Sequence, residues 1–388
     1  MGTVATAETR PARQELLGLT AWRGIAAVLV VLFHLDEIFS TRLAAHFALG
    51  PFTRLVERGY AFVDLFFILS GFVIAHVYGQ RVLLEARALG RFLALRLGRI
   101  YPMHLVVVFI LALDPLSRLL AGDASAFTGN RSGWSLVTEL LLLDSIGLHD
   151  GLTWNEVSWS VSAEWLSYLL APVLLLLIRH VRLGVLASAA AMLVGWLGVW
   201  AIANDDGGLG DVTFGLGGVR GILGFTIGIA AYRVHTSGVL ARVQAQQGAV
   251  LLSALAVGLV ATFAPHDAWF TPTFVALILT SVAASGAEAR LLENRALRWL
   301  GDISYSTYLL QQIFLAVALS AFANAINWSA IEVLGASALW LLSLLAVSTL
   351  TYRRIEVPAR DAVRSRVKRR EADPKTPQPV TSGVRPQK

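Results

Sequence analysis

The sequence contains no cysteine and little charge. Without cysteine among its 388 residues, a disulfide framework, a thiolate zinc site and a cysteine nucleophile are all excluded. Only 15% of the residues are charged, well below the about 25% of an average soluble domain, whereas 56% are hydrophobic. A chain of this composition is expected to have lipid as its solvent.

Other common signatures are also missing. We find no metal-ligand cluster, glycine-rich phosphate loop or nucleophile elbow, because the glycines of 215–228 lie in an apolar helical stretch and not after a strand. The polar start of the chain runs into an apolar segment too long for a signal sequence, so the first span is expected to be retained. No internal repeat is visible, which disfavours an inverted-repeat transporter.

Long apolar stretches recur along nearly the whole chain. A helix needs about 20 mostly apolar residues to cross a bilayer, and we identify ten candidates. They are residues 17–39, 60–78, 100–120, 159–178, 183–203, 214–234, 249–264, 270–287, 299–323 and 332–352. The predicted fold is all-α: a polytopic integral membrane protein with about ten transmembrane helices in one membrane domain, residues 17–358.

Basic residues are distributed unevenly between alternate loops. Cytoplasmic loops hold an excess of Lys and Arg, and placing the N-terminus inside puts 25 of these residues on that side and 5 on the other. Both termini are therefore predicted to be cytoplasmic, with residues 1–16 as a short N-terminal segment. We attribute the net charge of +6 to membrane anchoring and not to nucleic-acid binding.

Two segments outside the predicted spans have a distinctive composition. Residues 359–388 are rich in Lys, Arg, Pro and Ser, and we expect a disordered cytoplasmic tail that meets anionic lipid headgroups. The connection 114–155 holds five acidic residues and two tryptophans. It suits either a lid or acceptor-binding surface or an ordinary interfacial segment with one short amphipathic helix near 136–143.

Ionisable residues inside a span are costly, so each one is a functional candidate. Arg23 and His34 lie eleven residues apart, which returns them to nearly the same helix face about 16 Å apart. A histidine titrates near neutral pH and can take a proton from a hydroxyl. The alternatives are an arginine that extends to the headgroups and a histidine that packs between helices.

Three arginines and a glutamate extend this set. Arg96 and Arg99 are i,i+3 neighbours at the predicted cytoplasmic mouth of the third span, with Arg91 one turn earlier, and guanidinium groups suit phosphates. Plain anchoring charge is the alternative. Glu164 lies about 15 Å past Trp154, where it could orient a histidine, hold a sugar hydroxyl or form a structural ion pair.

The second span contributes one more candidate. Asp64 lies near its outer entry and is predicted to be a polar partner of the cavity, whereas Ser70 and Gly71 are interpreted as small residues for close helix packing.

Six motifs in this order resemble the membrane-bound acyltransferase-3 family, which includes bacterial glycan O-acetyltransferases. The motifs are WRGIAAVLVVLFH, FVDLFFILSGFVI, RFLALRLGRIYP, WSVSAEWLSYLLAP, ISYSTYLLQQ and YRRIEVP. The resemblance covers about residues 17–358 and implies a ten-helix core, an acyl-CoA donor bound from the cytoplasm and an acceptor that is often a sugar.

The family's motifs fall on particular residues of this chain. Its arginine and histidine, with ten residues between them, fall on Arg23 and His34, and its paired arginines fall on Arg96 and Arg99. Its tryptophan–serine–glutamate segment falls on three further positions: Trp159, Ser160 and Glu164.

One position departs from the family pattern. Where relatives commonly have a histidine in the ninth span, this chain has Gln311, which can form hydrogen bonds but cannot act as an acid or base. Because the chain ends soon after the tenth span, we also expect no fused hydrolase-like domain.

The sequence therefore predicts an O-acyltransferase of the bacterial inner membrane that moves an acyl group, most simply acetyl, from acyl-CoA to a sugar hydroxyl. His34, Arg23 and Glu164 are the expected catalytic residues, and Arg96, Arg99 and Arg91 are expected to bind acyl-CoA. Cavity or acceptor contacts are assigned to Asp64, Trp159, Ser160, Tyr168, Tyr305 and Gln311. Besides membrane lipid, the expected partners are acyl-CoA and a carbohydrate; no tightly bound cofactor, metal or nucleic acid is expected.

The sequence leaves several questions open. The acceptor, the acyl chain length and the oligomeric state are not determined, and transfer through a transient acyl-histidine is a variant of the direct route. A transporter or flippase of lipid-linked sugars is the competing class. A structural membrane subunit leaves the three ionisable residues Arg23, His34 and Glu164 without a purpose.

Overall fold

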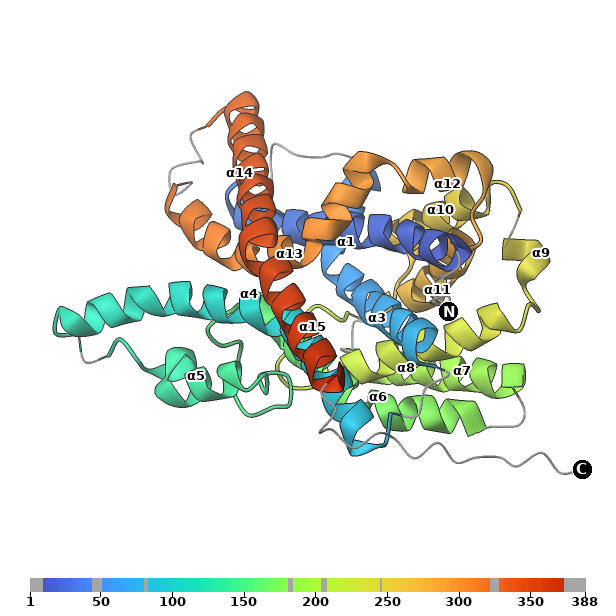
Figure 1. Ribbon diagram of the computed structural model, residues 1–388. Helices are drawn as coiled ribbons and strands as arrows, with labels where there is room; N and C mark the ends of the chain where they lie inside the picture. The colour runs from blue at the N-terminus through green and yellow to red at the C-terminus, as the bar shows by residue number, and fades with distance from the viewer. Residues whose placement is uncertain are drawn as a thin grey trace, which may run out of the picture.

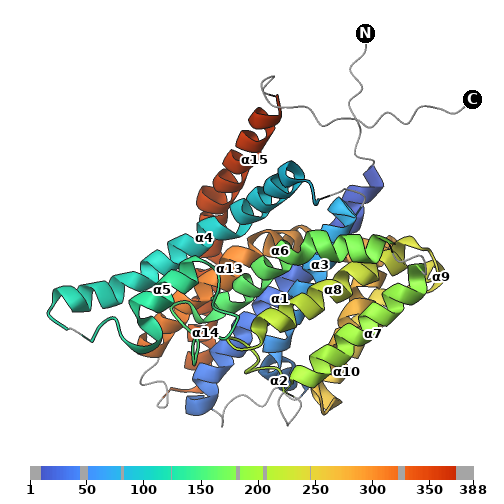
Figure 2. The ribbon, with the colours of Figure 1, turned by 90° about the horizontal axis from the view of Figure 1, so that it is seen from below.

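The computed structural model describes residues 10–43, 51–79, 83–123, 125–180, 184–203, 208–244, 246–321 and 328–372. Over these ranges the chain forms helices and no strand, which confirms the all-α prediction (Figures 1 and 2). The ten main helices are α1 (Arg10–Leu43), α3 (Phe62–Tyr78), α4 (Ala86–Leu120), α6 (Trp159–His180), α7 (Gly184–Ile202), α8 (Gly217–Thr236), α10 (Ala249–Phe263), α11 (Phe270–Val282), α13 (Arg295–Ala321) and α14 (Ala330–Thr351).

Each predicted span coincides with one of these helices. Among the described residues, six helices are long and apolar enough to cross a membrane, and α11 with α12 (Gly286–Leu292) forms a seventh candidate bent by 107°. The protein is therefore a multi-pass membrane protein. The count of ten spans and the side on which the termini lie stay predictions.

Helix α3 lies at the centre of the bundle and contacts α8 backbone to backbone. A Cβ on Gly71 would lie 1.9 Å from the Phe225 carbonyl oxygen, and one on Gly228 would lie 2.0 Å from that of Ile68. Only glycine allows this approach, which is typical of small residues between membrane helices. The interpretation of Gly71 as a packing residue is confirmed.

Helices α1 and α13 run side by side in the same direction (Figures 1 and 2). Gly18 packs next to Leu292, and further along both segments Gly24 packs against Gly301, where an added Cβ would lie 2.6 Å from the Gly301 nitrogen. A Cβ on Gly301 would in turn lie 2.0 Å from the Thr20 carbonyl oxygen, so position 301 lies between Thr20 and Gly24 in depth. Beyond this contact both helices advance by about 1.5 Å per residue.

The chain after α14 differs from the prediction. Helix α14 continues through a π-helical turn, Tyr352–Glu356, into α15 (Val357–Ala372), where the sequence predicted a disordered tail from 359 onward. The helix forms because α14 leads into it and Val363 packs against Gly98 of α4. The remainder of that tail, 373–388, lies outside the described residues, as do residues 1–9.

The bundle has two distinguishable ends. Figure 2 shows α15 and the first turns of α4 together at one end, which we call the basic end. The opposite end is where α3 and α6 begin. There the short helix predicted near 136–143 is present as α5 (Gly133–Leu140), in the segment that precedes the 3-10 turn η3 (Glu156–Ser158).

Candidate functional site

A cavity of about 210 Å³ lies between five helices, α1, α3, α4, α6 and α13. Its lining combines an apolar wall, mostly from α3, with a set of polar side chains. The polar lining residues are Thr20, Arg23, Ser70, Arg96, Arg99, Ser160, Glu164, Tyr168, Ser304, Tyr305 and Tyr308. Seven of the twelve residues singled out from the sequence are in this lining.

The cavity is elongated along the helix axes. On α3 its lining extends from Val63 to Ile74, which corresponds to about 16 Å. The first lining residue of α6 is Ser160 and the last of α13 is Tyr308, and their hydroxyls are 2.7 Å apart. These residues form the end of the cavity opposite the basic end. Arg96 lies at the basic end, with its guanidinium 5.7 Å from the ring centre of Tyr78.

Three arginines enter the cavity without a partner. Within the described part of the chain, neither salt bridges nor hydrogen bonds are formed by the guanidinium groups of Arg23, Arg96 and Arg99. Arg96 instead lies 5.9 Å from the ring centre of Tyr168. Among the lining residues the only carboxylate is Glu164. Three guanidinium groups therefore share the lining with one carboxylate, and this excess of positive charge favours the binding of an anion.

Glu164 is held by two hydroxyl groups. It accepts a hydrogen bond from Ser70 Oγ at 3.0 Å and another from the hydroxyl of Tyr168. The interpretation of Ser70 as a packing residue was wrong, because its side chain lines the cavity and binds Glu164. A serine in an apolar helix gives no sequence signal for its partner, which is 94 positions away.

A second carboxylate lies behind the arginines. Glu356, in the π-helical turn, is buried and accepts a hydrogen bond from Ser306 at 3.0 Å. It lies within electrostatic range of Arg23 and Arg99 but does not line the cavity. π-Helical turns are rare and recur at functional sites, and here the turn directs a carboxylate toward the arginines. The sequence analysis quoted this residue in a motif but assigned it no role.

His34 lies beyond the end of the cavity that carries Tyr308. Its Nδ1 is 2.9 Å from the carbonyl oxygen of Val30, four residues earlier. Because a carbonyl only accepts hydrogen bonds, Nδ1 carries the hydrogen in the neutral ring and the Nε2 lone pair is free to accept a proton. His34 is not in the lining, and the buried residues Ala27 and Val30 stand between it and Arg23.

Gln311 lies level with the stretch of α1 from Val30 to His34. It is ten residues beyond Gly301, as Val30 and His34 are ten residues beyond Thr20 and Gly24. Gln311 is fully buried, and neither its amide oxygen nor its amide nitrogen has a hydrogen-bond partner in the described structure. An unpartnered buried amide is costly and fits a place where a polar ligand or water binds.

Asp64 and Trp159 have a different setting from the one predicted. Asp64 is buried in a two-pronged ion pair with Arg220 of α8, with both nitrogen–oxygen distances at 2.8 Å. The Arg220 guanidinium lies 5.2 Å from the ring centre of Trp159. Neither predicted residue lines the cavity. Arg91 is exposed and also lies outside the lining.

A pair of acids lies in the segment between α4 and α6. Ser158 Oγ is 2.5 Å from Glu139 Oε1 and 2.8 Å from Asp144 Oδ2, but it has one hydrogen to donate. Burial, with the nearby Asp144 charge, raises the pKa of Glu139, and burial raises the pKa of Asp144 to about 6. One proton is therefore retained on this pair near neutral pH.

The described residues contain no group of three His, Asp or Glu side chains able to hold a metal ion. The cavity itself offers guanidinium groups beside hydroxyls and a carboxylate, and His34 lies about three turns beyond Arg23 on α1.

The family comparison agrees with this geometry. A family model described as an acyltransferase domain, acyltransferase-3, matches residues 16–353. The chain belongs to the acyltransferase-3 family. The match confirms the resemblance found in the motifs and includes the lining residues of all five helices around the cavity of this acyltransferase-3 protein. The protein is accordingly a membrane acyltransferase.

One curated relative of this acyltransferase-3 chain is "Protein 2 in picA locus" from Rhizobium radiobacter. The two are 31% identical over 166 residues, which cover 39% of this chain and 75% of the relative. No solved structure matches the chain.

Proposed function

We propose that this membrane acyltransferase takes its acyl group from cytoplasmic acyl-CoA and transfers it to a hydroxyl of a sugar. The sugar belongs to a surface polysaccharide, an exopolysaccharide or a lipid-linked precursor. The observation that carries the proposal is the cavity in which three guanidinium groups lack partners while its long axis leads toward His34. In this proposal the membrane is the bacterial inner membrane and the basic end faces the cytoplasm.

The donor is bound by charge at one end and by shape along its length. Arg96 and Arg99 take the phosphate groups of acyl-CoA, because a planar guanidinium can bind two phosphate oxygens at once. Arg23 adds a third positive charge further into the cavity. The amide-bearing arm of the donor then runs along the apolar wall of α3, with Ser70 and Glu164 beside it as hydrogen-bond partners.

The transfer step uses the free nitrogen of His34. Nε2 removes the proton from the acceptor hydroxyl as its oxygen attacks the thioester carbonyl, and a carbon–oxygen bond forms. The carbon–sulfur bond then breaks, and the departing thiolate receives the proton from the imidazolium. The products are the ester and free coenzyme A, so atoms and charge balance. Holding both reactants in line supplies a further part of the rate enhancement.

A test follows from the division between binding and chemistry. Purified protein is given radiolabelled acetyl-CoA, and label transfer to a glycan acceptor is compared for wild type and His34→Gln. We expect the variant to lose about 10²- to 10⁴-fold in kcat while its affinity for acyl-CoA, measured by calorimetry, stays within about twofold. His235→Gln, which removes an imidazole of α8 outside the cavity, is the matched control.

The outcomes separate the competing classes. Normal transfer by His34→Gln refutes the assigned base. A wild-type protein that moves lipid-linked sugars across vesicles but neither binds nor consumes acetyl-CoA refutes the donor and is the result expected of a flippase. Trapping of labelled acyl-protein that disappears in His34→Gln would indicate the acyl-histidine route in place of direct attack.

A further inference from the structure

Tyr308 forms the α13 side of the cavity end nearest His34. Its hydroxyl accepts a hydrogen bond from Ser160 Oγ at 2.7 Å and donates one to the carbonyl oxygen of Val157 at 3.1 Å. The two partners belong to α6 and to the turn before it, whereas Tyr308 belongs to α13. The phenol therefore bridges separate segments across the end of the cavity and is fixed at its tip.

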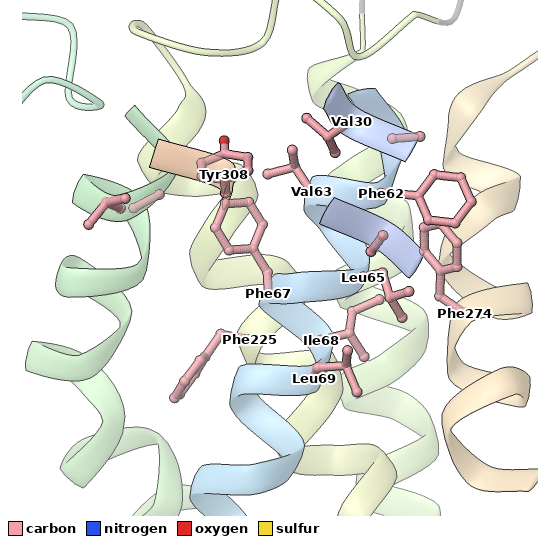
Figure 3. Packing of buried hydrophobic residues seen from close by; sticks show 14 of the residues in the cluster. Val30, Phe62, Val63, Leu65, Phe67, Ile68, Leu69, Phe225, Phe274 and Tyr308 are labelled. Atoms are coloured by element: carbon pink, nitrogen blue, oxygen red, sulfur yellow. The ribbon is translucent and has the colours of Figure 1, made fainter. Parts of the chain in front are cut away.

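The ring of Tyr308 completes an apolar end wall. Val63 and Phe66 of α3 line the same end, and the rings of Phe66 and Tyr308 meet edge to face with centres 6.1 Å apart. Figure 3 shows Tyr308 beside Val63 and Phe67. Tyr308 is only 7% exposed, so its ring is enclosed by its neighbours.

We propose that Tyr308 determines the length of the acyl group that the protein accepts. The assignment rests on the proposed function, in which phosphates bind at the arginine end and the acyl group points toward Tyr308. With the phosphates of the donor bound by the arginines, the acyl carbons at its other end meet the Tyr308 ring. A two-carbon group stops short of it, whereas a longer chain must displace the ring.

The surrounding helices leave the ring no room to move back. Helix α13 is fixed against α1 by the contact of Gly24 with Gly301, and α3 is fixed against α8 by Gly71 and Gly228. A packed wall of this kind does not widen by one methylene without strain. Forcing extra methylenes into a filled core lowers affinity by about tenfold or more.

The test compares chain-length profiles. We measure kcat/KM of acetyl-, butyryl- and hexanoyl-CoA for wild type, Tyr308→Ala and Tyr308→Phe. Wild type should prefer acetyl over hexanoyl by at least about tenfold. In Tyr308→Ala the ratio should move toward hexanoyl by at least about tenfold, because each methylene that fills the new space raises affinity about fourfold. Tyr308→Phe keeps the ring and should keep the preference for short chains.

A matched control removes an equally large ring elsewhere. Tyr101→Ala deletes a partly buried tyrosine of α4 whose hydroxyl also donates to a backbone carbonyl, that of Leu140, but which does not line the cavity. Its profile should equal that of wild type. Should Tyr308→Ala fail to fold, Tyr308→Leu is the second variant, because its smaller side chain keeps most of the packing. It should leave enough space at the end of the cavity for butyryl-CoA.

The outcomes separate this assignment from the proposed function. An active wild type whose chain-length profile is unchanged in Tyr308→Ala and Tyr308→Leu refutes the assignment to Tyr308 alone. A wild type that accepts hexanoyl-CoA as readily as acetyl-CoA refutes it as well. A wild type that neither binds nor consumes any acyl-CoA refutes the proposed function, and with it this assignment.

Discussion

Arg220 and the three arginines of the cavity occupy the same bundle but have opposite surroundings. Arg220 is 1% exposed and has a carboxylate, two carbonyl oxygens at 2.8 and 3.2 Å and an aromatic ring around it. Arg23, Arg96 and Arg99 form no ion pair or hydrogen bond with the described residues. The cavity arginines are half-buried, so two properties separate the two kinds: the cavity arginines have accessible surface and lack ionic partners, whereas Arg220 is enclosed by its partners.

This difference gives the two kinds of arginine different purposes. A guanidinium whose donors are all used within the protein stabilises one arrangement of helices and has nothing left for a ligand. A guanidinium left without ionic partners lowers the stability of the empty protein, and in the proposed function a ligand supplies the missing charge. Substitutions around Arg220 should therefore lower the stability of the fold, whereas substitutions of the cavity arginines should weaken ligand binding.

The largest effect is expected from Asp64→Ala. Removing this carboxylate leaves Arg220 buried without a counter-charge, which costs about 3–5 kcal/mol of folding free energy. Unfolding of the purified protein in detergent measures the loss. The double variant Asp64→Leu, Arg220→Met removes both charges and should recover most of it. An Asp64→Ala protein as stable as wild type would mean that Arg220 resembles the cavity arginines after all.

Replacing the cavity arginines should affect binding and leave folding intact. Arg96→Met and Arg99→Met should each weaken coenzyme A binding by about 10- to 100-fold, the value of a charged hydrogen bond of about 1.5–3 kcal/mol, without lowering stability. Calorimetry and thermal unfolding measure the two quantities. Exposed Arg298→Met is the control. Equal affinity, or a loss of stability like that of Asp64→Ala, would remove the distinction between the two groups.

The acid pair adds a buried charge that has no cation beside it. Because the pKa values of Glu139 and Asp144 are raised in the folded state, stability is complete below about pH 4 and falls as the pH rises through about 6. The slope reaches about 1.4 kcal/mol per pH unit for one proton. Glu139→Gln should reduce this pH dependence of the unfolding free energy, measured by denaturant titration between pH 4.5 and 7.5. Parallel curves for variant and wild type would contradict the shared proton.

The smallest effect is expected at Trp159. Trp159→Phe keeps an aromatic ring beside Arg220 but weakens the cation–π contact, and should lower the unfolding free energy by about 0.5–1 kcal/mol. Coenzyme A affinity should not change, because Trp159 does not line the cavity. A substantial loss of affinity without a loss of stability would return Trp159 to the substrate site, where the sequence analysis placed it.

The sequence predicted the helices and much of the cavity, for reasons that are local. Apolar stretches of spanning length predict helices, and charged or hydroxyl residues within them, such as Arg23 and Glu164, indicate a polar interior. Arg96 and Arg99 follow from i,i+3 spacing at one helix end. The helix α15 was missed because its composition is that of a disordered tail, while its stability depends on contact with α4.

The choice of partners could not be read from the sequence. Asp64 and Arg220 are 156 positions apart, and nothing in either span indicates that they meet. The sequence therefore placed Asp64 in the cavity and assigned no role to Arg220. Tyr308 was missed for the same reason, since its partner Ser160 is 148 positions away. Helical spacing put His34 on the face of Arg23, but spacing carries no information about where a cavity ends.

The glycine contacts of α3 also determine which side of the cavity can yield. With Gly71 against Phe225 and Gly228 against Ile68, the back of α3 rests directly on the backbone of α8 at these two positions. Helix α3 is therefore the rigid wall of the cavity. Because α13 is held in the same way against α1, a donor that enters is expected to displace α4, so the work of opening falls on the segment that carries Arg96 and Arg99.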